Sequence, residues 1–257
     1  MKIDSYKGTD NKSDAYTEIV RDLMRTKQTA ILFSCFSLMT IMAIATIASS
    51  RAANPDPLQK LLDTKICPGC QLIGADLSAV DLSGANLANA ELRGASLTGA
   101  DLREANLSGA NLSSADLNNA DLLRANLSGA DLSGVDLGNA YLADTDFSGA
   151  NLSGAEIHHA DARQANFNRA NLSGANLNRT LLNSANLSDA NLNRASLRDA
   201  SLNRANLDRA NLADANLCGA YLRKISQNEA NFSGANLRDT HTSRSDPEWS
   251  TPEKCTE

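Results

Sequence analysis

The chain has 257 residues, a formal net charge of −6, and only 4% aromatic residues. This length allows one sizeable domain with additional segments, and the modest negative charge argues against a general nucleic-acid-binding protein. From about residue 71 onward Ala, Leu, Asn, Asp, Ser and Gly dominate. Such low complexity usually indicates disorder. Here, however, Leu and Ala recur at a fixed spacing, which favours a repetitive fold.

The N-terminal region contains one uncharged hydrophobic segment. Residues 1–28 are polar and are expected to form a flexible tail, whereas residues 29–50 (TAILFSCFSLMTIMAIATIASS) carry no charge and are long enough to cross a bilayer. Basic residues precede this segment, namely Arg21, Arg25 and Lys27. The positive-inside rule therefore predicts a cytoplasmic N-terminus and export of the chain that follows.

Two interpretations of residues 29–50 stay open. Small residues at 48–50 or 50–52 would suit cleavage of a signal peptide. An uncleaved signal anchor fits the long N-terminal tail and the full spanning length. A buried helix of a soluble domain is less favoured, because no polar face interrupts the apolar run.

Residues 51–70 are expected to form a linker and a short capping helix. Asp56 can cap a helix and Pro57 suits its first turn, while Pro68-Gly69 would end it. The apolar residues between them fall on one helical face: Leu58, Leu61, Leu62 and Ile66. A terminal repeat otherwise exposes its apolar core, so an amphipathic helix is the expected form of a cap.

From Leu72 to Leu237 the sequence repeats every five residues. Leu occupies 28 of the 34 central positions, and Ala occupies 28 of the 34 positions two residues earlier. A period of five would rotate successive Leu by about 140° around an α-helix and send alternate Leu to opposite faces of a strand. The sequence therefore predicts a coil whose own unit is five residues, with Ala and Leu inside and turn-forming residues at the corners.

Many of these units match the motif A(D/N)LXX, for example residues 105–109 (ANLSG), 130–134 (ADLSG) and 150–154 (ANLSG). In this the chain resembles pentapeptide repeat proteins over about two-thirds of its length. The resemblance implies an all-β fold, a right-handed quadrilateral β-helix with four repeats per coil. It would occupy residues 71–240 as a rod roughly 40 Å long, followed by a C-terminal tail at 241–257. Residues 61–70 (LLDTKICPGC) look like the opening of many bacterial, notably cyanobacterial, members.

In the geometry that the resemblance implies, residues twenty positions apart stack directly. Phe147 and Phe167 are then expected to form an aromatic pair in the core. Ala162 is small for a central position and predicts a void unless those rings fill it, at a typical cost of a few kcal/mol. Gln227 places an amide in the core, which predicts looser packing in the last coils. One outward column alternates in charge, and we interpret it as keeping register: Arg169, Asp189, Arg209 and Glu229.

Cys67-Pro68-Gly69-Cys70 is the one motif with candidate chemistry. A C-x-x-C motif can exchange thiols, but the βαβ context of thioredoxin-like folds is missing. A zinc site would need further ligands at suitable spacing. In an exported domain, a structural disulfide between Cys67 and Cys70 is the favoured interpretation, and it would tie the cap to the first coil. Cys218 is expected to point outward and Cys255 lies in the tail, so their pairing stays open.

His158-His159 together with Glu156 raises the hypothesis of metal binding. Adjacent residues of the coil point in different directions, so exposed surface residues are the favoured interpretation. No nucleophile–base pair, phosphate-binding loop or pair of catalytic carboxylates stands out from the repeats. The sequence therefore predicts a protein that is not an enzyme, with no cofactor and no bound metal.

Charge is unevenly spread along the expected rod. Residues 71–160 carry twelve acids and three bases, whereas residues 161–240 carry seven acids and ten bases. Such a dipolar rod could bind a charged partner. Drift among solvated repeat positions explains the same asymmetry equally well.

These observations favour a non-enzymatic structural or protein-interaction scaffold. It would be membrane-anchored through residues 29–50 or secreted, face the periplasm or the thylakoid lumen, and bind an unidentified protein partner rather than nucleic acid. The resemblance implies one alternative, a DNA mimic that binds DNA gyrase and protects it from quinolones. The acidic half suits that role, but the hydrophobic segment and the basic half count against it. A thiol redox role of Cys67 and Cys70 is a third hypothesis.

Overall fold

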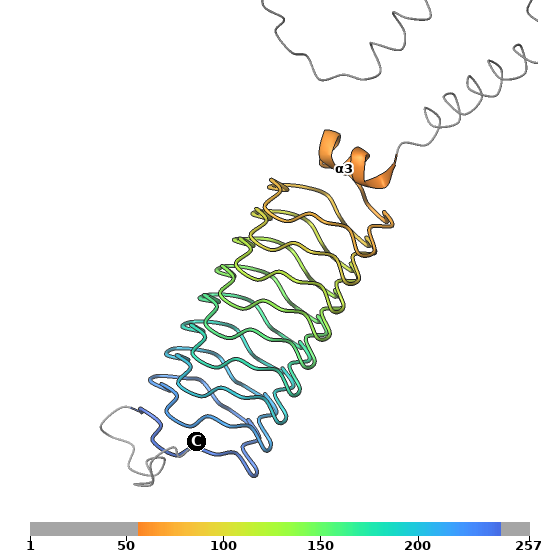
Figure 1. Ribbon diagram of the computed structural model, residues 1–257. Helices are drawn as coiled ribbons and strands as arrows, with labels where there is room; N and C mark the ends of the chain where they lie inside the picture. Colours follow the sequence, from red (N-terminus) through yellow and green to blue (C-terminus); the bar gives the residue numbers. More distant parts are fainter. Residues whose placement is uncertain (1–55, 243–257) are drawn as a thin grey trace, which may run out of the picture. The chain divides into compact units, whose positions relative to one another are not determined.

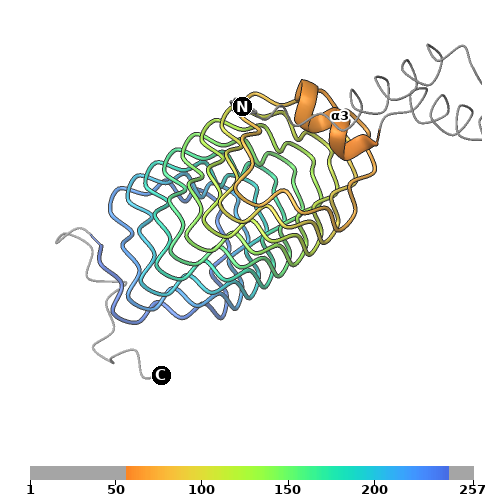
Figure 2. The ribbon, with the colours of Figure 1, turned by 45° about the horizontal axis from the view of Figure 1, so that its top comes forward.

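The computed structural model describes residues 56–242, which form one helix followed by a β-solenoid (Figure 1). Helix α3 spans Pro57–Thr64. From Ile66 to His241 the backbone forms parallel β-bridges, one in every five residues, and each bridge joins residues twenty positions apart. One coil therefore has twenty residues and four sides, and successive coils stack along one axis (Figure 2).

Helix α3 is the helix predicted after Pro57. The Asp56 carboxylate accepts a hydrogen bond from the Leu58 amide at its start, and Lys65 ends it in a left-handed conformation (φ 55°). Leu61 is fully buried and Leu58 packs against the same core. Two residues expected on this inner face differ: Leu62 stays 45% exposed, and Ile66 lies outside the helix, in the first coil.

Each side of a coil is built in the same way. Ala105 and Leu107 point inward and are fully buried, while Asn106 between them forms the bridges to the neighbouring coils. A turn follows, in which the Ala110 amide donates to the Leu107 carbonyl at 3.0 Å. Its second central residue, Gly109, has φ 66°, as a type II turn requires. This alternation of a short extended piece and a turn explains the five-residue period.

The backbone polar groups are satisfied between coils. The Leu107 amide donates to the Asn126 carbonyl (2.7 Å), and the Asn126 amide donates back to the Ala105 carbonyl (2.9 Å). The turn contributes a third bond, from the Gly109 amide to the Ser128 carbonyl (2.9 Å). The same pattern recurs along the solenoid, so each coil is held to the next by parallel-type backbone hydrogen bonds.

The core is one continuous column of Leu and Ala side chains. The Phe147 and Phe167 rings stack in it as predicted, with centroids 4.9 Å apart and planes within 5°. Thr145 and Thr180 take Ala-type positions and are fully buried. Each hydroxyl donates at 2.7 Å to a carbonyl oxygen, of Leu122 and Ile157 respectively, so neither is left unsatisfied in the core.

The solenoid begins one repeat earlier than the expected start at residue 71. Ile66 already bridges Asn86, and Cys67 occupies a central position with no exposed surface. The repeat was hidden because its central residue is Cys and Lys65 stands where Ala is usual. At the other end Gln227 is exposed and Phe232 is only partly buried, as expected for looser packing there.

The predicted tail 1–28, the hydrophobic segment 29–50 and the tail beyond residue 242 lie outside the described residues. Within 56–242, α3 is too short and too polar to cross a membrane, and the solenoid contains no spanning helix.

Candidate functional site

The four sides of the solenoid can be compared through their outward columns, each named here after its first full repeat: the Leu72, Leu77, Leu82 and Leu87 faces. A column contains the bridging residues that precede the central residues of one face, twenty positions apart. The interior of the four faces is alike. Any site that distinguishes this protein must therefore lie on the outward columns and the turns beside them.

The Leu72 face carries an amide ladder. The Asn151 side-chain amide donates to Asp131 (3.0 Å), and each following Asn donates to the one before it at 3.0 to 3.2 Å, through to Asn231. Such a row of identical hydrogen bonds covers the face with small polar groups and fixes the stacking register.

The Leu82 face is built differently. Its column runs through Asp81, Asp101, Asp121, Tyr141, Asp161, Leu181, Ser201, Tyr221 and His241. Three of these side chains are large and exposed: Tyr141 (59%), Leu181 (41%) and Tyr221 (40%). The Tyr221 ring stacks on His241 with centroids 4.3 Å apart. Solvent-exposed apolar side chains in one row mark a candidate interaction surface.

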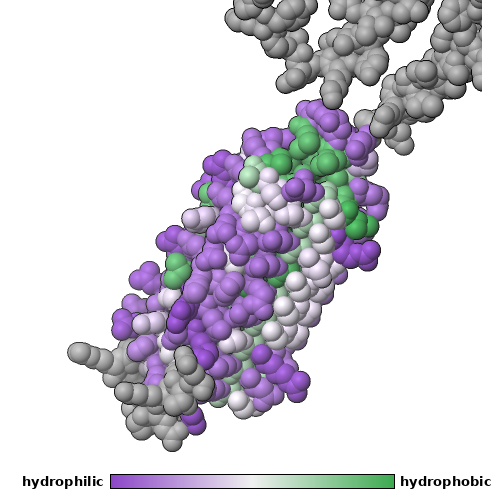
Figure 3. Space-filling model, viewed as in Figure 1, coloured by the Kyte–Doolittle hydropathy of each residue, from purple (hydrophilic) through white to green (hydrophobic). Residues whose placement is uncertain are grey.

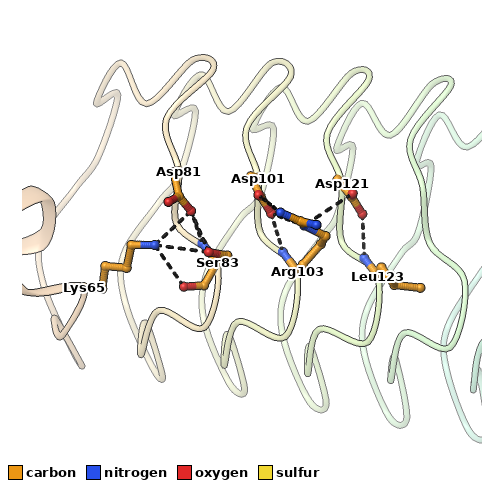
Figure 4. Close-up of polar contacts among 7 residues, drawn as sticks. All are labelled: Lys65, Asp81, Ser83, Asp101, Arg103, Asp121 and Leu123. Atoms are coloured by element: carbon orange, nitrogen blue, oxygen red, sulfur yellow. Dashed lines mark hydrogen bonds and ion pairs between the residues drawn. The ribbon is translucent and has the colours of Figure 1, made fainter.

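The N-terminal end of the Leu82 face is a polar cluster (Figure 4). The Lys65 ammonium contacts the Asp81 carboxylate at 2.8 Å and donates to the Ser83 carbonyl at 3.2 Å. The Ser83 hydroxyl donates to the same carboxylate at 2.6 Å. The Lys65 hydrogen bond, followed by those from Ser83, holds the pKa of Asp81 well below its usual range.

In the next coils Arg103 binds the side chains of Asp101 and Asp121. Its Nε donates to Asp101 at 2.8 Å, and Nε lies 3.7 Å from an oxygen of Asp121 (Figure 4). The Arg103 hydrogen bond lowers the pKa of Asp101, and the same contact raises the pKa of Arg103. All three acids that begin this column are thus paired with a cation.

The middle of the Leu82 face contains a surface recess of about 350 Å³, lined by Ala143, Asp144, Arg163, Gln164, Asn183 and Ser184. Arg163 donates two hydrogen bonds, of 2.7 and 2.6 Å, to the Asp161 carboxylate. These bonds lower the pKa of Asp161. The Gln164 amide donates to Asp144 at 2.9 Å. These contacts fix the polar walls, while the small Ala143 leaves the space open.

The cysteines of the predicted motif lie where α3 meets the first coil. Cys67 and Cys70 are joined as a disulfide with Cα atoms 5.4 Å apart. Cys218, expected to point outward, is only 2% exposed. Cys218 is disulfide-bonded, so its sulfur is covered instead of facing solvent. Cys255 lies outside the described residues.

The two histidines have different environments. His159 is exposed, as expected, but His158 is partly buried, with Nδ1 inaccessible to solvent and without a hydrogen-bond partner among the described residues. Its ring fills the space beside Gly138, where an added Cβ would lie 2.3 Å from the His158 Cε1 atom. Residues 56–242 contain no cluster of three or more His, Cys, Asp or Glu side chains that could hold a metal ion.

The column of alternating charge contains one close ion pair. Arg209 donates to both oxygens of Asp189 at 2.7 Å, and this lowers the pKa of Asp189. The pair joins two successive coils at exposed positions, where an ion pair contributes little to stability.

The exposed row on the Leu82 face was missed in the sequence, although a signal was present. Tyr141, Leu181 and Tyr221 each replace the usual Asn, Asp or Ser. When the sequence is written in rows of twenty residues, all three fall in one column. When the sequence is read in units of five residues, the same three residues look like isolated departures from the repeat motif.

The fold defines the class of protein, a β-solenoid of five-residue units. The Leu82 face of this solenoid differs from the others in its exposed row of large side chains. The chain belongs to the pentapeptide repeat family. The sequence profile of that family, described as Pentapeptide repeats, matches in eight copies, with overlapping segments from 70–109 to 200–241. The resemblance seen in the repeats is therefore confirmed.

Several solved structures are similar to this chain. HetL, a pentapeptide repeat protein involved in heterocyst differentiation regulation in Nostoc sp. strain PCC 7120, is 29% identical and covers 71% of this chain and 94% of its own, with a TM-score of 0.43. Trypsin-treated QnrB1, a plasmid-mediated fluoroquinolone resistance protein, is 22% identical over 71% and 88% of the two chains, with a TM-score of 0.39. A pentapeptide repeat protein of the Arabidopsis thaliana thylakoid lumen is 35% identical over 40% and 69%, with a TM-score of 0.22. No curated protein sequence matches the chain.

Proposed function

We propose that this protein is a non-enzymatic scaffold that binds a protein partner outside the cytoplasm through one face of a right-handed quadrilateral solenoid. The observation that carries the proposal is the exposed row on the Leu82 face, where Tyr141, Leu181 and Tyr221 interrupt an otherwise polar surface. Tyr is enriched where proteins bind one another, because its ring is large and its hydroxyl stays solvated.

The polar side chains of this face support binding rather than catalysis. Asp81, Asp101 and Asp161 are held by Lys65, Arg103 and Arg163, which lowers their pKa values and leaves them poor general bases at neutral pH. The repeated backbone hydrogen bonds supply a stiff support. A rigid face presents its side chains with little loss of entropy on binding.

The extracytoplasmic location follows from residues 29–50, as an anchor or a signal peptide. Hydrophobic side chains also gather around α3 at the N-terminal end of the solenoid (Figure 3), where Leu62, Ile66 and Ile73 are 45 to 55% exposed. These exposed apolar side chains suit contact with a membrane surface. A topology reporter fused after Glu257 is expected to be active outside the cytoplasm, and cytoplasmic activity would refute this location.

The partner is sought by affinity purification of the full-length protein from its own membranes. A protein that co-purifies in stoichiometric amount, and does so less with serines at Tyr141 and Leu181, is the expected result. Serines at Asn151 and Asn171 of the Leu72 face are the matched control. Recovery of the scaffold alone under mild conditions, including after cross-linking, would count against a binding function.

One observation favours modulation of DNA gyrase as a second candidate. Asp116, Asp136 and Glu156 follow one another in the column of the Leu77 face, and a row of carboxylates can resemble a row of phosphates. A gyrase supercoiling assay with residues 55–257 separates the two functions. The scaffold proposal expects no effect at excess protein, whereas inhibition of supercoiling or protection from quinolones would support the second candidate.

For the cysteine motif we propose a structural disulfide that braces α3 against the first coil. Cys67 has no exposed surface, whereas thiol exchange needs an accessible sulfur. Alkylation with and without prior reduction, followed by mass spectrometry, is expected to show Cys67 and Cys70 protected until reduced. Turnover in an insulin-reduction assay would contradict the structural role.

A further inference from the structure

We infer that the Leu82 face binds an acidic amphipathic helix of the partner protein between Tyr141 and Tyr221, an inference that rests on the proposed function. The surface consists of the exposed side chains Tyr141, Leu181, Tyr221, Arg204, Arg223 and Lys224, and is called here the Tyr141–Tyr221 surface. Spacing, charge and relief each favour such a helix.

The spacing of the apolar side chains matches a helix lying along the solenoid axis. The bridges place Leu181 two coils beyond Tyr141, and Tyr221 two coils beyond Leu181. Two coils correspond to about 9.6 Å at the usual strand separation. Residues seven apart in an α-helix lie about 10.5 Å apart on the same side. In an extended strand, same-side residues recur about every 6.8 Å, which does not fit the row.

The charge of the surface selects an acidic helix. Arg204, Arg223 and Lys224 are exposed basic residues in the turns beside the row. Of the acids in the same part of the face, Asp161 is paired with Arg163, whereas Asp144 accepts a hydrogen bond from the neutral Gln164 amide and is outnumbered by the three cations. The surface therefore presents net positive charge around an apolar row, and Glu or Asp flanking the apolar residues of a helix complements it.

The recess on this surface gives the helix a place to insert a side chain. The recess of about 350 Å³ is lined by Ala143 and Asn183, which lie two positions after Tyr141 and Leu181. A side chain that enters it would lie beside the row, level with the coil between Tyr141 and Leu181. Anchoring of one residue in a recess, flanked by flat contacts, is typical of a helix bound to a protein surface.

A designed peptide tests the inference on the full-length protein in detergent. The probe is a fluorescently labelled helical peptide of about 21 residues, with Leu at every seventh position and Glu on both sides of that row. The double substitution Leu181→Ser and Tyr221→Ser is expected to weaken binding at least about tenfold, as is replacement of the peptide's Glu by Lys. The matched control, serines at Asn171 and Asn211 of the Leu72 face, is expected to change affinity less than about twofold. Absence of binding, or equal loss with both pairs, overturns the inference.

Photo-crosslinking in the native host separates failure of the inference from failure of the proposed function. A photoreactive residue replaces Leu181 or, as control, Asn171 in the full-length chain. A cross-link from position 181 to an acidic amphipathic helix of another protein supports the inference. A cross-link to an extended or basic segment, to a second copy of this chain, or only from position 171 overturns the inference and leaves the scaffold function standing. Absence of any protein cross-link from either position overturns the scaffold function itself.

Discussion

The Leu72 and Leu82 faces share their interior, their turns and their backbone hydrogen bonds, yet their outer surfaces differ. On the Leu72 face Asn side chains form a ladder from Asp131 to Asn231. On the Leu82 face ion pairs, aromatic rings and an apolar side chain take the same positions. The inward residues of a repeat therefore specify the fold, whereas the residue between Ala and Leu is free to specify a surface.

The largest losses of stability are expected for substitutions in the core, where the two faces should not differ. Leu172 and Leu182 are fully buried central residues of the Leu72 and Leu82 faces. Replacing either by Ala should lower the free energy of unfolding by about 2–5 kcal/mol, because each change leaves a cavity. Urea unfolding followed by circular dichroism measures both. A change below about 1 kcal/mol for Leu182 alone would mean that the interiors of the two faces are not equivalent.

The ladder should contribute more to stability than the exposed row. Asn171 donates to Asn151 (3.0 Å), and its side-chain oxygen accepts from Asn191 and from the Ser173 amide. Asn171→Ala should therefore cost about 1–2 kcal/mol. Leu181→Ala, at a 41% exposed position of the Leu82 face, should cost less than about 0.5 kcal/mol. Urea midpoints of the two variants test this, and equal costs would refute a structural distinction between the faces.

Stability should depend on pH through the Leu82 face. Arg163 lowers the folded-state pKa of Asp161, so this contact stabilises the fold above the unfolded-state pKa near 4 and the stabilisation is lost as pH falls through the folded value. The advantage of the wild type over Asp161→Asn should be at most about 1 kcal/mol, constant from neutral pH down to about 5, and smaller below about 4. Thermal unfolding across this range measures it. Asn171→Ala, which removes no titrating group, serves as the control and should show a constant difference.

The smallest effect is expected at the polar cluster near α3. Arg103 is 51% exposed although it contacts both Asp101 and Asp121. Arg103→Gln should change the free energy of unfolding by less than about 0.5 kcal/mol, because exposed ion pairs contribute little. Thermal unfolding at low and high salt measures it. A loss above about 1 kcal/mol that disappears in salt would show that this cluster holds the first coils together.

Most of the fold could be predicted from the sequence, because the period of five excludes both regular secondary structures. The twenty-residue coil came from the resemblance to pentapeptide repeat proteins, and the stacking of Phe147 on Phe167 followed from it. The start at Ile66 did not, because Lys65 and Cys67 take the places of Ala and Leu there. The bonds between coils are made by backbone groups, so the solenoid can continue through a repeat whose residues depart from the motif.

The candidate surface could not be predicted in the same way, since the properties that define it belong to neighbouring coils. Exposure of Leu181 depends on Asp161 and Ser201, which lie beside it in the neighbouring coils. The burial of His158 likewise requires a glycine at position 138. These relations become visible only when the sequence is arranged in rows of twenty residues, which places stacked residues in one column.

The twenty-residue register also constrains how such a chain can change in length. Removal or duplication of one whole coil keeps every downstream residue on its own face. Loss of a single five-residue unit between Tyr141 and Tyr221 would preserve the core but shift every later residue by one side, placing Tyr221 on a different face from Tyr141. Insertions and deletions tolerated by the fold in multiples of five are therefore tolerated by the surface only in multiples of twenty.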